Sequence, residues 1–376
     1  MFRTGRYARL VLIILRGAAD GLALAAPYGD GRYAKLRGEL ALARPGGNDG
    51  VLKLDGVFGI HSAFANIHEY YRKGQAIVIH AVASPYRERS HFDGQDVLEN
   101  GTTGAGDERN GWLNRALAPL GGSLGNEAAI ALSQNTPLVL RGKNSVTSWA
   151  PSMLPDADDD TLRRLEMLYA DDEFFRTRLA QALDSQEIAG EMRGVQHGRR
   201  RGNETTRMNT TMEQAAKFLT APNGPRIAVI ESGGWDTHAN QGAAGGTLAN
   251  KFGALDEGVK TLREGLGDVW LDTAVAVVTE FGRTVKVNGT RGTDHGTGTA
   301  ALLLGGAVQG GKVIADWPGL GPGDLYQGRD LYPTIDIRSV FKAILVHHLG
   351  VPDAFVARDV FPDSCNAKIM DDLIRS

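Results

Sequence analysis

The stretch RIAVIESGGWDTH, residues 226–238, decides the fold that we predict for this chain. Its first half is short, β-branched and apolar on both faces, which is typical of a strand buried inside a parallel sheet. Its second half has two glycines, followed by Asp236 and His238. Open parallel sheets bind their ligands beyond the carboxyl ends of the strands. We therefore predict a core strand whose following loop presents a carboxylate and an imidazole to a site.

Five further segments share this apolar pattern and are bounded by Gly, Pro or polar residues. They are RLVLIIL (9–15), AIVIHAV (76–82), PLVL (137–140), TAVAVVT (273–279) and AALLL (300–304). Helical patterns lie between the strands, in HSAFANIHEYYRKG (61–74), SHFDGQDVLENG (90–101) and GTLANKFGALDEGVKTLREGLG (246–267). Strands that alternate with helices indicate an α/β fold, here a three-layer α/β/α sandwich around a mostly parallel central sheet.

The length of the chain, 376 residues, exceeds the roughly 250–300 that one core usually reaches, so either two domains or one domain with an insertion is expected. We predict a single domain over residues 1–376. Residues 141–222 break the strand–helix alternation with charged helical patterns at 158–183 and 210–221, and we interpret them as a helical insertion. Its basic run at 196–206 is read as a solvated loop in preference to a binding patch.

The composition is typical of a soluble globular protein, with 42% apolar and 23% charged residues. A net charge of -3 gives no electrostatic reason to expect a nucleic-acid partner. No apolar run approaches the roughly 20 residues that span a bilayer, so no membrane partner is expected. The single cysteine, Cys365, excludes an internal disulfide and a thiolate metal cluster. The segment MFRTGRYARLVLIIL (1–15) lacks a small-residue cleavage site, so we interpret its apolar part as the first core strand and not as a signal peptide.

Polar residues stand next to the predicted strands, at the edge where a site would form. They are Asp20, Ser90, His91, Asp236, His238, Glu280, Asp294 and His295. Each has a structural explanation of its own, such as an Asx turn, a helix cap in the S-x-x-D pattern that Ser90 opens, or an ion pair between Glu280 and Arg283. Together they crowd carboxylates that repel one another unless a cation neutralises them. Oxygen and imidazole ligands without a thiolate suit Zn²⁺ or Mn²⁺, and with fewer nitrogens Mg²⁺ or Ca²⁺.

Longer segments resemble the signature segments of the DUF1501 family. They are ILRGAADGL (14–22), RSHFDGQD (89–96), GGWDTHANQ (233–241), TEFGRT (279–284) and TDHGTGTAALLLGG (293–306), and the resemblance extends to DLYPTIDIRSVFKAIL (330–345). That family belongs to the alkaline-phosphatase-like, or sulfatase-like, superfamily, whose fold the resemblance implies. Members commonly carry twin-arginine export signals. The resemblance therefore implies a periplasmic or secreted protein of which this chain is a mature form, with a cytoplasmic location as the alternative.

The resemblance also implies a ligand set for one or two divalent ions, with Zn²⁺ first and Mn²⁺, Mg²⁺ or Ca²⁺ as alternatives: Asp20, Asp236, His238, Glu280 and His295. This set departs from the superfamily pattern in two places. Asp236 and His238 stand two residues apart, where the superfamily spaces them by four. Phe281, directly after Glu280, replaces a histidine ligand. The group of Asp236, His238 and His295 is therefore the more complete of the two implied sites.

Catalytic residues follow from the same resemblance. Ser90 matches the superfamily's nucleophile at the N-terminus of a helix, where amides and the helix dipole favour an anion, and His91 comes next. Arg283 stands near enough in sequence to hold that anion, or is a solvated charge. The implied function is metal-dependent hydrolysis of phosphate or sulfate esters, with a small-molecule or carbohydrate substrate.

Other kinds of site find less support in the sequence. The alternative to a hydrolase is a non-catalytic binding or structural protein with a degraded metal site, which Phe281 favours. The chain has no GxGxxG, P-loop or G-x-S-x-G motif, so dinucleotide cofactors and an α/β-hydrolase triad are set aside.

Overall fold

The computed structural model describes residues 8–120, 128–150, 164–165, 167–180 and 203–375. Over these residues the core is a nine-stranded sheet with the order β11-β5-β10-β9-β1-β8-β6-β7, and β14 pairs with β5. The strands are β1 (Arg9–Leu15), β5 (Ala76–Ala83), β6 (Ala129–Ala131), β7 (Thr147–Ser148), β8 (Ile227–Ser232), β9 (Thr273–Val278), β10 (Thr299–Leu304), β11 (Lys312–Ile314) and β14 (Ile335–Asp336). The sheet is mostly parallel, as predicted, with β1 at its centre between β8 and β9.

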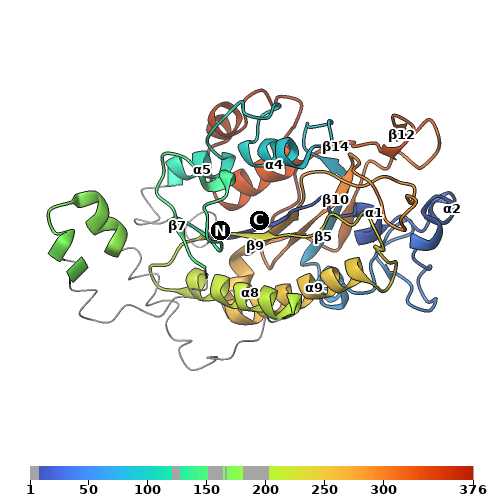
Figure 1. Cartoon of the computed structure of the whole chain (residues 1–376), viewed down its shortest axis with the longest axis horizontal. Helices are drawn as coiled ribbons and strands as arrows, with labels where there is room; N and C mark the ends of the chain where they lie inside the picture. The colour runs from blue at the N-terminus through green and yellow to red at the C-terminus, as the bar shows by residue number, and fades with distance from the viewer. Residues whose placement is uncertain (1–7, 121–127, 151–163, 166, 181–202, 376) are drawn as a thin grey trace.

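Helices cover both faces of this sheet (Figure 1). One face carries α3 (Ala65–Arg72), α8 (Glu204–Thr220) and α9 (Thr247–Leu266), and the other carries α4 (His91–Asn100), α5 (Trp112–Leu117) and α10 (Ile337–Ala343). Strand β1 shows why its sequence is apolar throughout. Leu10, Leu12 and Ile14 pack into the core under α4, α5 and α10, while its odd-numbered residues from 11 to 15 pack into the core under α8 and α9. The predicted three-layer α/β class is confirmed.

Shorter elements surround the sheet. They are α1 (Gly21–Leu24), α2 (Tyr33–Arg37), α11 (Asp353–Phe355), the strands β2 (Ala25–Ala26), β3 (Leu52–Lys53), β4 (Gly59–Ile60), β12 (Leu325–Tyr326) and β13 (Asp330–Leu331), the 3-10 segments Gly38–Leu40, Ala118–Leu120, Leu138–Leu140 and Gly267–Asp272, and the π-helical segments Ile344–His348 and Val356–Val360. No helix within the described ranges is both long enough and apolar enough to cross a membrane.

The strand predicted for PLVL (137–140) is wrong, because these residues form a 3-10 turn. Pro137 starts the turn, the amide of Leu140 donates to its carbonyl at 3.0 Å, and Val139 and Leu140 are fully buried. A short apolar run fills the core equally well as a strand or as a turn, so its pattern could not decide between them. The place in the sheet beside β8 belongs instead to β6.

Strand β10 runs antiparallel to both of its neighbours, β5 and β9. Its first residue therefore lies at the same edge of the sheet as the last residues of β1, β5, β8 and β9. The connection from β9 folds back on itself, with bonds from the amide of Gly282 to Thr297 O (2.9 Å) and from that of Thr284 to Asp294 O (2.8 Å). The residues that precede β10 are in this way carried to the edge where the other strands end.

The insertion predicted at residues 141–222 is described only in part. Residues 173–180 are helical, α8 covers the predicted pattern at 210–221 and packs on α9, and the two-residue strand β7 joins the edge of the sheet. Much of the pattern at 158–183, and residues 196–202 of the basic run, lie outside the described residues. A single domain with this insertion stays a prediction.

Two buried histidines should make the stability of the fold depend on pH. Burial lowers the pKa of His80 and that of His348 from 6.5 to about 4. The ring of His80 hydrogen-bonds the carbonyl of Ala25 at 2.8 Å, and the ring of His348 hydrogen-bonds the carbonyl of Arg9 at 2.8 Å. Between pH 6.5 and pH 4 the unfolded chain binds protons that the folded chain does not. The free energy of unfolding should therefore fall as the pH falls through this window, by about 2 kcal/mol per histidine at pH 5.

Urea unfolding at pH 7.5 and pH 5.0 measures this loss. His348→Gln keeps a donor for the carbonyl of Arg9 but does not titrate. Between the two pH values the free energy of unfolding of this variant should therefore fall by about 2 kcal/mol less than that of the wild type. Equal losses in the variant and the wild type would contradict the assignment to His348.

Candidate metal centre

The loops that follow the parallel strands meet at one edge of the sheet. The turn after β1 and the loop after β8 approach so closely that a Cβ on Gly17 would lie 2.6 Å from the amide nitrogen of Asp236. Gly292 is equally confined, because its Cβ would lie 2.3 Å from the carbonyl carbon of His238. Glycine is required at both positions, and the Gly-rich segments next to the predicted site residues are explained by this close packing.

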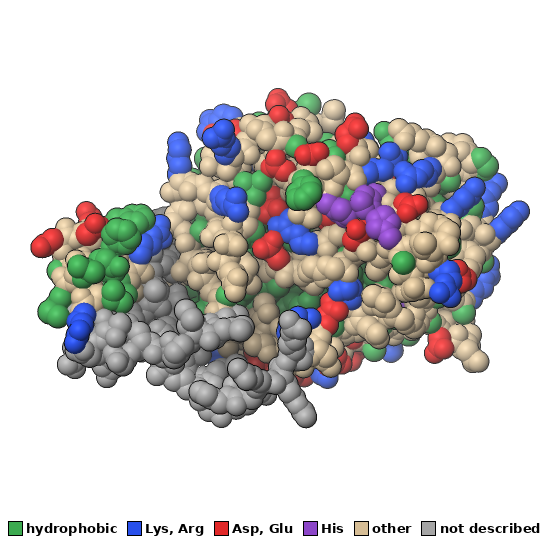
Figure 2. All heavy atoms as spheres, in the orientation of Figure 1, with side chains coloured by type: hydrophobic (Ala, Val, Ile, Leu, Met, Phe, Trp, Pro, Cys, Tyr) green, Lys and Arg blue, Asp and Glu red, His purple; other side chains and the backbone are tan. Residues whose placement is uncertain are grey.

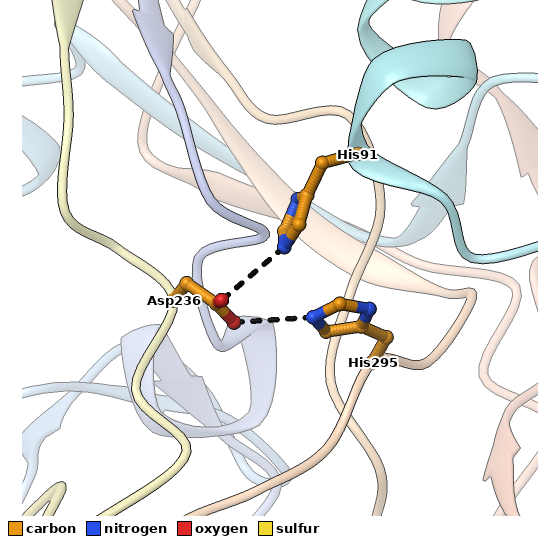
Figure 3. Close-up of side chains that lie close together, drawn as sticks. All are labelled: His91, Asp236 and His295. Atoms are coloured by element: carbon orange, nitrogen blue, oxygen red, sulfur yellow. Dashed lines mark hydrogen bonds and ion pairs between the residues drawn. The ribbon is translucent and has the colours of Figure 1, made fainter.

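Histidine side chains gather on the face of the molecule shown in Figure 2, bordered by acidic and basic side chains. In Figure 3 His91, Asp236 and His295 point toward one another from three different elements. One ligand atom of each lies within 4.8 Å of those of the other two. Asp236 joins them, with Oδ1 3.2 Å from His295 Nε2 and Oδ2 3.4 Å from His91 Nε2.

His238 completes this group from the same loop as Asp236. Its Nε2 atom lies 3.0 Å from Asp236 Oδ1 and 3.0 Å from His295 Nε2. The structure therefore brings together the three residues of the more complete predicted site, Asp236, His238 and His295. It adds the imidazole of His91, which the sequence resemblance placed among the catalytic residues.

Each of the three imidazoles is held through its Nδ1 atom by a group that accepts hydrogen bonds. His91 Nδ1 lies 2.8 Å from Glu280 Oε1, and His238 Nδ1 lies 3.1 Å from Asp294 Oδ1. The Nδ1 atom of His295 lies 2.9 Å from the carbonyl oxygen of Arg89. Because a carbonyl or an ionised carboxylate can only accept, Nδ1 carries the proton in each ring, and in the neutral ring Nε2 carries a lone pair. This is the way in which proteins orient metal-binding histidines.

Such an arrangement needs a positive charge at its centre. When both rings are neutral with Nδ1 protonated, the Nε2 lone pairs of His238 and His295 lie 3.0 Å apart and face the anionic Oδ1 of Asp236 at 3.0 and 3.2 Å, so they repel one another unless a cation lies between them. Burial lowers the pKa of His295 and so disfavours a proton on that ring, whereas the hydrogen bond to Glu280 raises the pKa of His91. A divalent cation fits the donor set of three nitrogens and one carboxylate oxygen.

Arg283 pairs with Asp236 from the protein interior, and its side chain is not exposed to hold an anion from solvent. Its side chain is fully buried, with NH1 2.5 Å from Asp236 Oδ1, Nε 3.1 Å from Thr293 Oγ1 and a further bond to the carbonyl of Thr293. Burial alone would raise the pKa of Asp236, but Arg283 outweighs it and the pKa is lowered. The carboxylate is thus kept ionised and pointed at the imidazoles.

Ser90 stands at the N-cap position of α4, yet its side chain makes no capping hydrogen bond. Its amide donates to the hydroxyl oxygen of Tyr86 at 3.0 Å. The capping role that its S-x-x-D pattern allows is therefore not taken up by the hydroxyl group. Two nearby arginines are occupied: Arg87 donates to the carbonyls of Ser84 and Tyr86, and Arg89 pairs with Asp330 and Gln327.

Asp20 and Glu280 are not among the converging ligand atoms. Asp20 is fully buried, caps α1 and pairs with Arg37. Glu280 is fully buried too and bonds His91. Although burial would raise its pKa, the hydrogen bonds from His91, Gln95 and Gly17 lower it, so that Glu280 stays ionised. Asp20 and Glu280 therefore do not come together as the second metal site that the resemblance implies.

Sequence reasoning did not identify which residues hold the Nδ1 atoms. The sequence allows His295 to pair with Asp294 or with a backbone carbonyl; the structure pairs it with the carbonyl of Arg89, and Asp294 bonds His238. The role of Arg89 is visible only in the backbone conformation of the structure, and no sequence pattern marks it. Its φ of 63° is in the left-handed region, a conformation that costs energy in a non-glycine residue, and it turns the carbonyl toward the ring.

Several solved structures are similar to the chain, at low identity. One is a protein in the alkaline phosphatase superfamily from Vibrio parahaemolyticus, with a TM-score of 0.46, 11% identity, and coverage of 96% of this chain and 71% of the other. The PsFucS1 sulfatase from Pseudoalteromonas sp. has a TM-score of 0.37 and 13% identity, with 92% and 68% covered. The C-terminal periplasmic domain of EcEptC from Escherichia coli, in complex with Zn, has a TM-score of 0.39 and 10% identity, with 81% and 75% covered.

Likenesses of this size carry no conclusion about what the chain does. A search of curated proteins found no match to it. A family model described as "Protein of unknown function (DUF1501)" does match, over residues 76–358. That match spans more than half of the chain and contains the segments of α4, β8, β9 and β10 that build the centre, and the protein therefore belongs to the DUF1501 family.

Proposed function

We propose that the protein is a metal-dependent hydrolase of phosphate or sulfate esters. One observation carries the proposal: three imidazoles, each fixed through Nδ1, turn Nε2 toward one carboxylate. His91, Asp236, His238 and His295 would hold the ion, and three nitrogen ligands with one oxygen favour Zn²⁺. Such an ion supplies Lewis acidity that neutralises charge on the oxygens of the ester.

The N-terminus of α4 would receive the anionic group of the substrate. α4 begins at His91, directly after Ser90, and the amides of its first turn and its dipole favour a negative charge there. The first amide of this helix to donate within it is that of Gly94, which bonds the carbonyl of Ser90. Earlier amides are thus available to an anion placed beside Ser90 and His91.

Ser90 would act as the nucleophile, since its hydroxyl group is not used to cap the helix. Its oxygen would bond to the phosphorus or sulfur atom while the bond to the ester oxygen breaks. The hydroxyl proton goes to solvent, and the departing alcohol takes one from solvent. Water would then hydrolyse the seryl ester, which restores the hydroxyl group and releases phosphate or sulfate.

Metal binding is the first test of the proposed function. The full chain should contain metal as purified, and Zn²⁺ added to the chelated protein should raise its Tm. Binding to the native state alone stabilises it by about 2.7 kcal/mol at a ligand concentration of 100 Kd. His347→Ala is a matched control, because His347 is a histidine outside the group and should leave both results unchanged.

Activity is tested on the metal-loaded protein with a panel of aryl phosphate and aryl sulfate esters, and hydrolysis that chelation removes and Zn²⁺ restores is the expected result. Protein that contains no metal, and whose Tm is unchanged by Zn²⁺, Mn²⁺, Mg²⁺ or Ca²⁺, would show the proposal to be wrong. If metal binds but no ester is hydrolysed, a binding protein on this fold is the better description.

A further inference from the structure

We propose that the centre holds one divalent ion and not two, and that Glu280 and Asp20 serve other purposes: Glu280 orients His91, and Asp20 holds Arg37. The inference rests on the proposed function and concerns the number of ions in the same site. Both carboxylates stand where the sequence resemblance implies metal ligands, so what they contact decides the matter.

Asp20 has no lone pair left for a metal. A carboxylate offers about four acceptor sites. Oδ1 accepts from the amides of Leu22 (3.1 Å) and Ala23 (3.2 Å), and Oδ2 accepts from Arg37 and from Gln241 Nε2 (2.7 Å). The positive charge that the buried carboxylate requires is already supplied by the guanidinium of Arg37, which is itself fully buried.

Glu280 is occupied mainly through one of its oxygens. Its Oε1 atom accepts from the amide of Gly17 (2.9 Å), from His91 Nδ1 (2.8 Å) and from Gln95 Nε2 (3.2 Å). Its Oε2 atom lies 2.9 Å from Thr279 Oγ1, a hydroxyl that is also 2.7 Å from the carbonyl oxygen of Leu15. The carboxylate is completely buried, so an ion could reach it only by displacing these donors. The contact with His91 instead ties Glu280 to the proposed ion through an imidazole.

Phe281 packs against two of the imidazoles. Its buried ring stacks on that of His91, with centroids 5.1 Å apart and planes at 25°, and lies 5.5 Å from that of His295. A ring at this place has no atom that binds a metal, but it fixes the planes of the two imidazoles that flank it. Phe281, which stands where the superfamily has a histidine ligand, thus serves as a packing surface for His91 and His295.

Glu280 is accordingly a positioning residue, which acts through His91. It holds the proton on Nδ1 and thereby directs the lone pair of Nε2 at the ion. Loss of such a partner typically weakens metal binding by about 10–100-fold, while the ligands themselves stay in place. A ligand of a second ion would behave differently, because its removal would lower the number of ions bound.

The number of Zn²⁺ ions bound by the full chain tests the inference. Isothermal titration of chelated wild type and mass spectrometry of the intact metal-loaded protein should both give one ion per chain. Two ions per chain would overturn the inference and leave the proposed hydrolase standing. Zero would overturn the proposed function itself, so the two failures are distinguishable.

Two variants of Glu280 separate positioning from ligation. Glu280→Gln keeps an oxygen that accepts from His91 Nδ1, and should bind one ion with an affinity within about tenfold of the wild type. Glu280→Leu removes the acceptor, and should still bind one ion but about 10–100-fold more weakly. If Glu280→Gln binds fewer ions than the wild type, Glu280 is a ligand and the inference is wrong. Because Glu280→Gln preserves shape and acceptor, it remains informative if the leucine variant fails to fold.

Discussion

Alanine in place of His238 should weaken Zn²⁺ binding by more than the roughly 10–100-fold that loss of a ligand's hydrogen-bond partner costs. Among the proposed ligands, His238 is the one whose removal should disturb the protein least, because its side chain is 44% exposed and leaves no buried cavity. Its Nε2 atom faces both Asp236 and His295, so its loss leaves three of the four proposed donors, His91, Asp236 and His295. Titration of the chelated variant with Zn²⁺, beside urea unfolding without metal, separates the loss of binding from any loss of stability.

Asp294→Ala is the graded control for this result. It leaves the imidazole of His238 in place and removes the acceptor that holds its Nδ1, an oxygen that also accepts from Asn288 Nδ2, so its effect should fall within the roughly 10–100-fold range, below that of His238→Ala. The order of affinities should therefore be wild type, Asp294→Ala and then His238→Ala. A folded His238→Ala variant that binds Zn²⁺ as tightly as the wild type would place the metal elsewhere in the molecule.

The residues of the candidate site could be predicted from the sequence because the ends of buried strands can be recognised there. Asp236 and His238 follow a run that is apolar at every position, and such runs occur in strands covered on both faces. The edge to which a strand's last residue belongs then follows from the parallel topology. Placing His295 at the same edge required a further inference, because His295 precedes a strand instead of following one. The segment between β9 and β10 has no helical pattern, which a parallel crossover would need, and this is consistent with the antiparallel course of β10.

The roles of the carboxylates could not be found in this way. Whether Asp20 binds a metal or a guanidinium depends on Arg37, 17 residues further along the chain in a helix that no site pattern marks. The role of Glu280 depends on His91 and on the amide of Gly17, which packing brings to it from other elements. A sequence shows which groups can carry charge, but the partner that a buried charge takes is settled by the packing.

The second large effect should come from Ser90. Ser90→Ala should retain its metal and its fold while turnover of an aryl ester falls by several orders of magnitude. An N-cap serine that bonds its helix costs about 0.5–2 kcal/mol of stability when it is replaced, but the hydroxyl of Ser90 makes no such bond. The free energy of unfolding of Ser90→Ala should therefore stay close to that of the wild type. Ser90→Thr, which keeps the hydroxyl group, is the matched control and should restore part of the turnover.

A rapid quench of the wild type during turnover should leave a phosphoryl or sulfuryl group on the peptide that contains Ser90, detectable by mass spectrometry, and Ser90→Ala should show none. The competing explanation is that water attacks the ester directly and Ser90 only marks the start of α4. In that case Ser90→Ala would keep most of a metal-dependent activity, and no adduct would form in the wild type. Ser90→Asp separates the two mechanisms once more, because aspartate caps a helix well but cannot form the seryl ester. Turnover that survives in both Ser90→Ala and Ser90→Asp would assign the attack to water and leave the proposed metal centre intact.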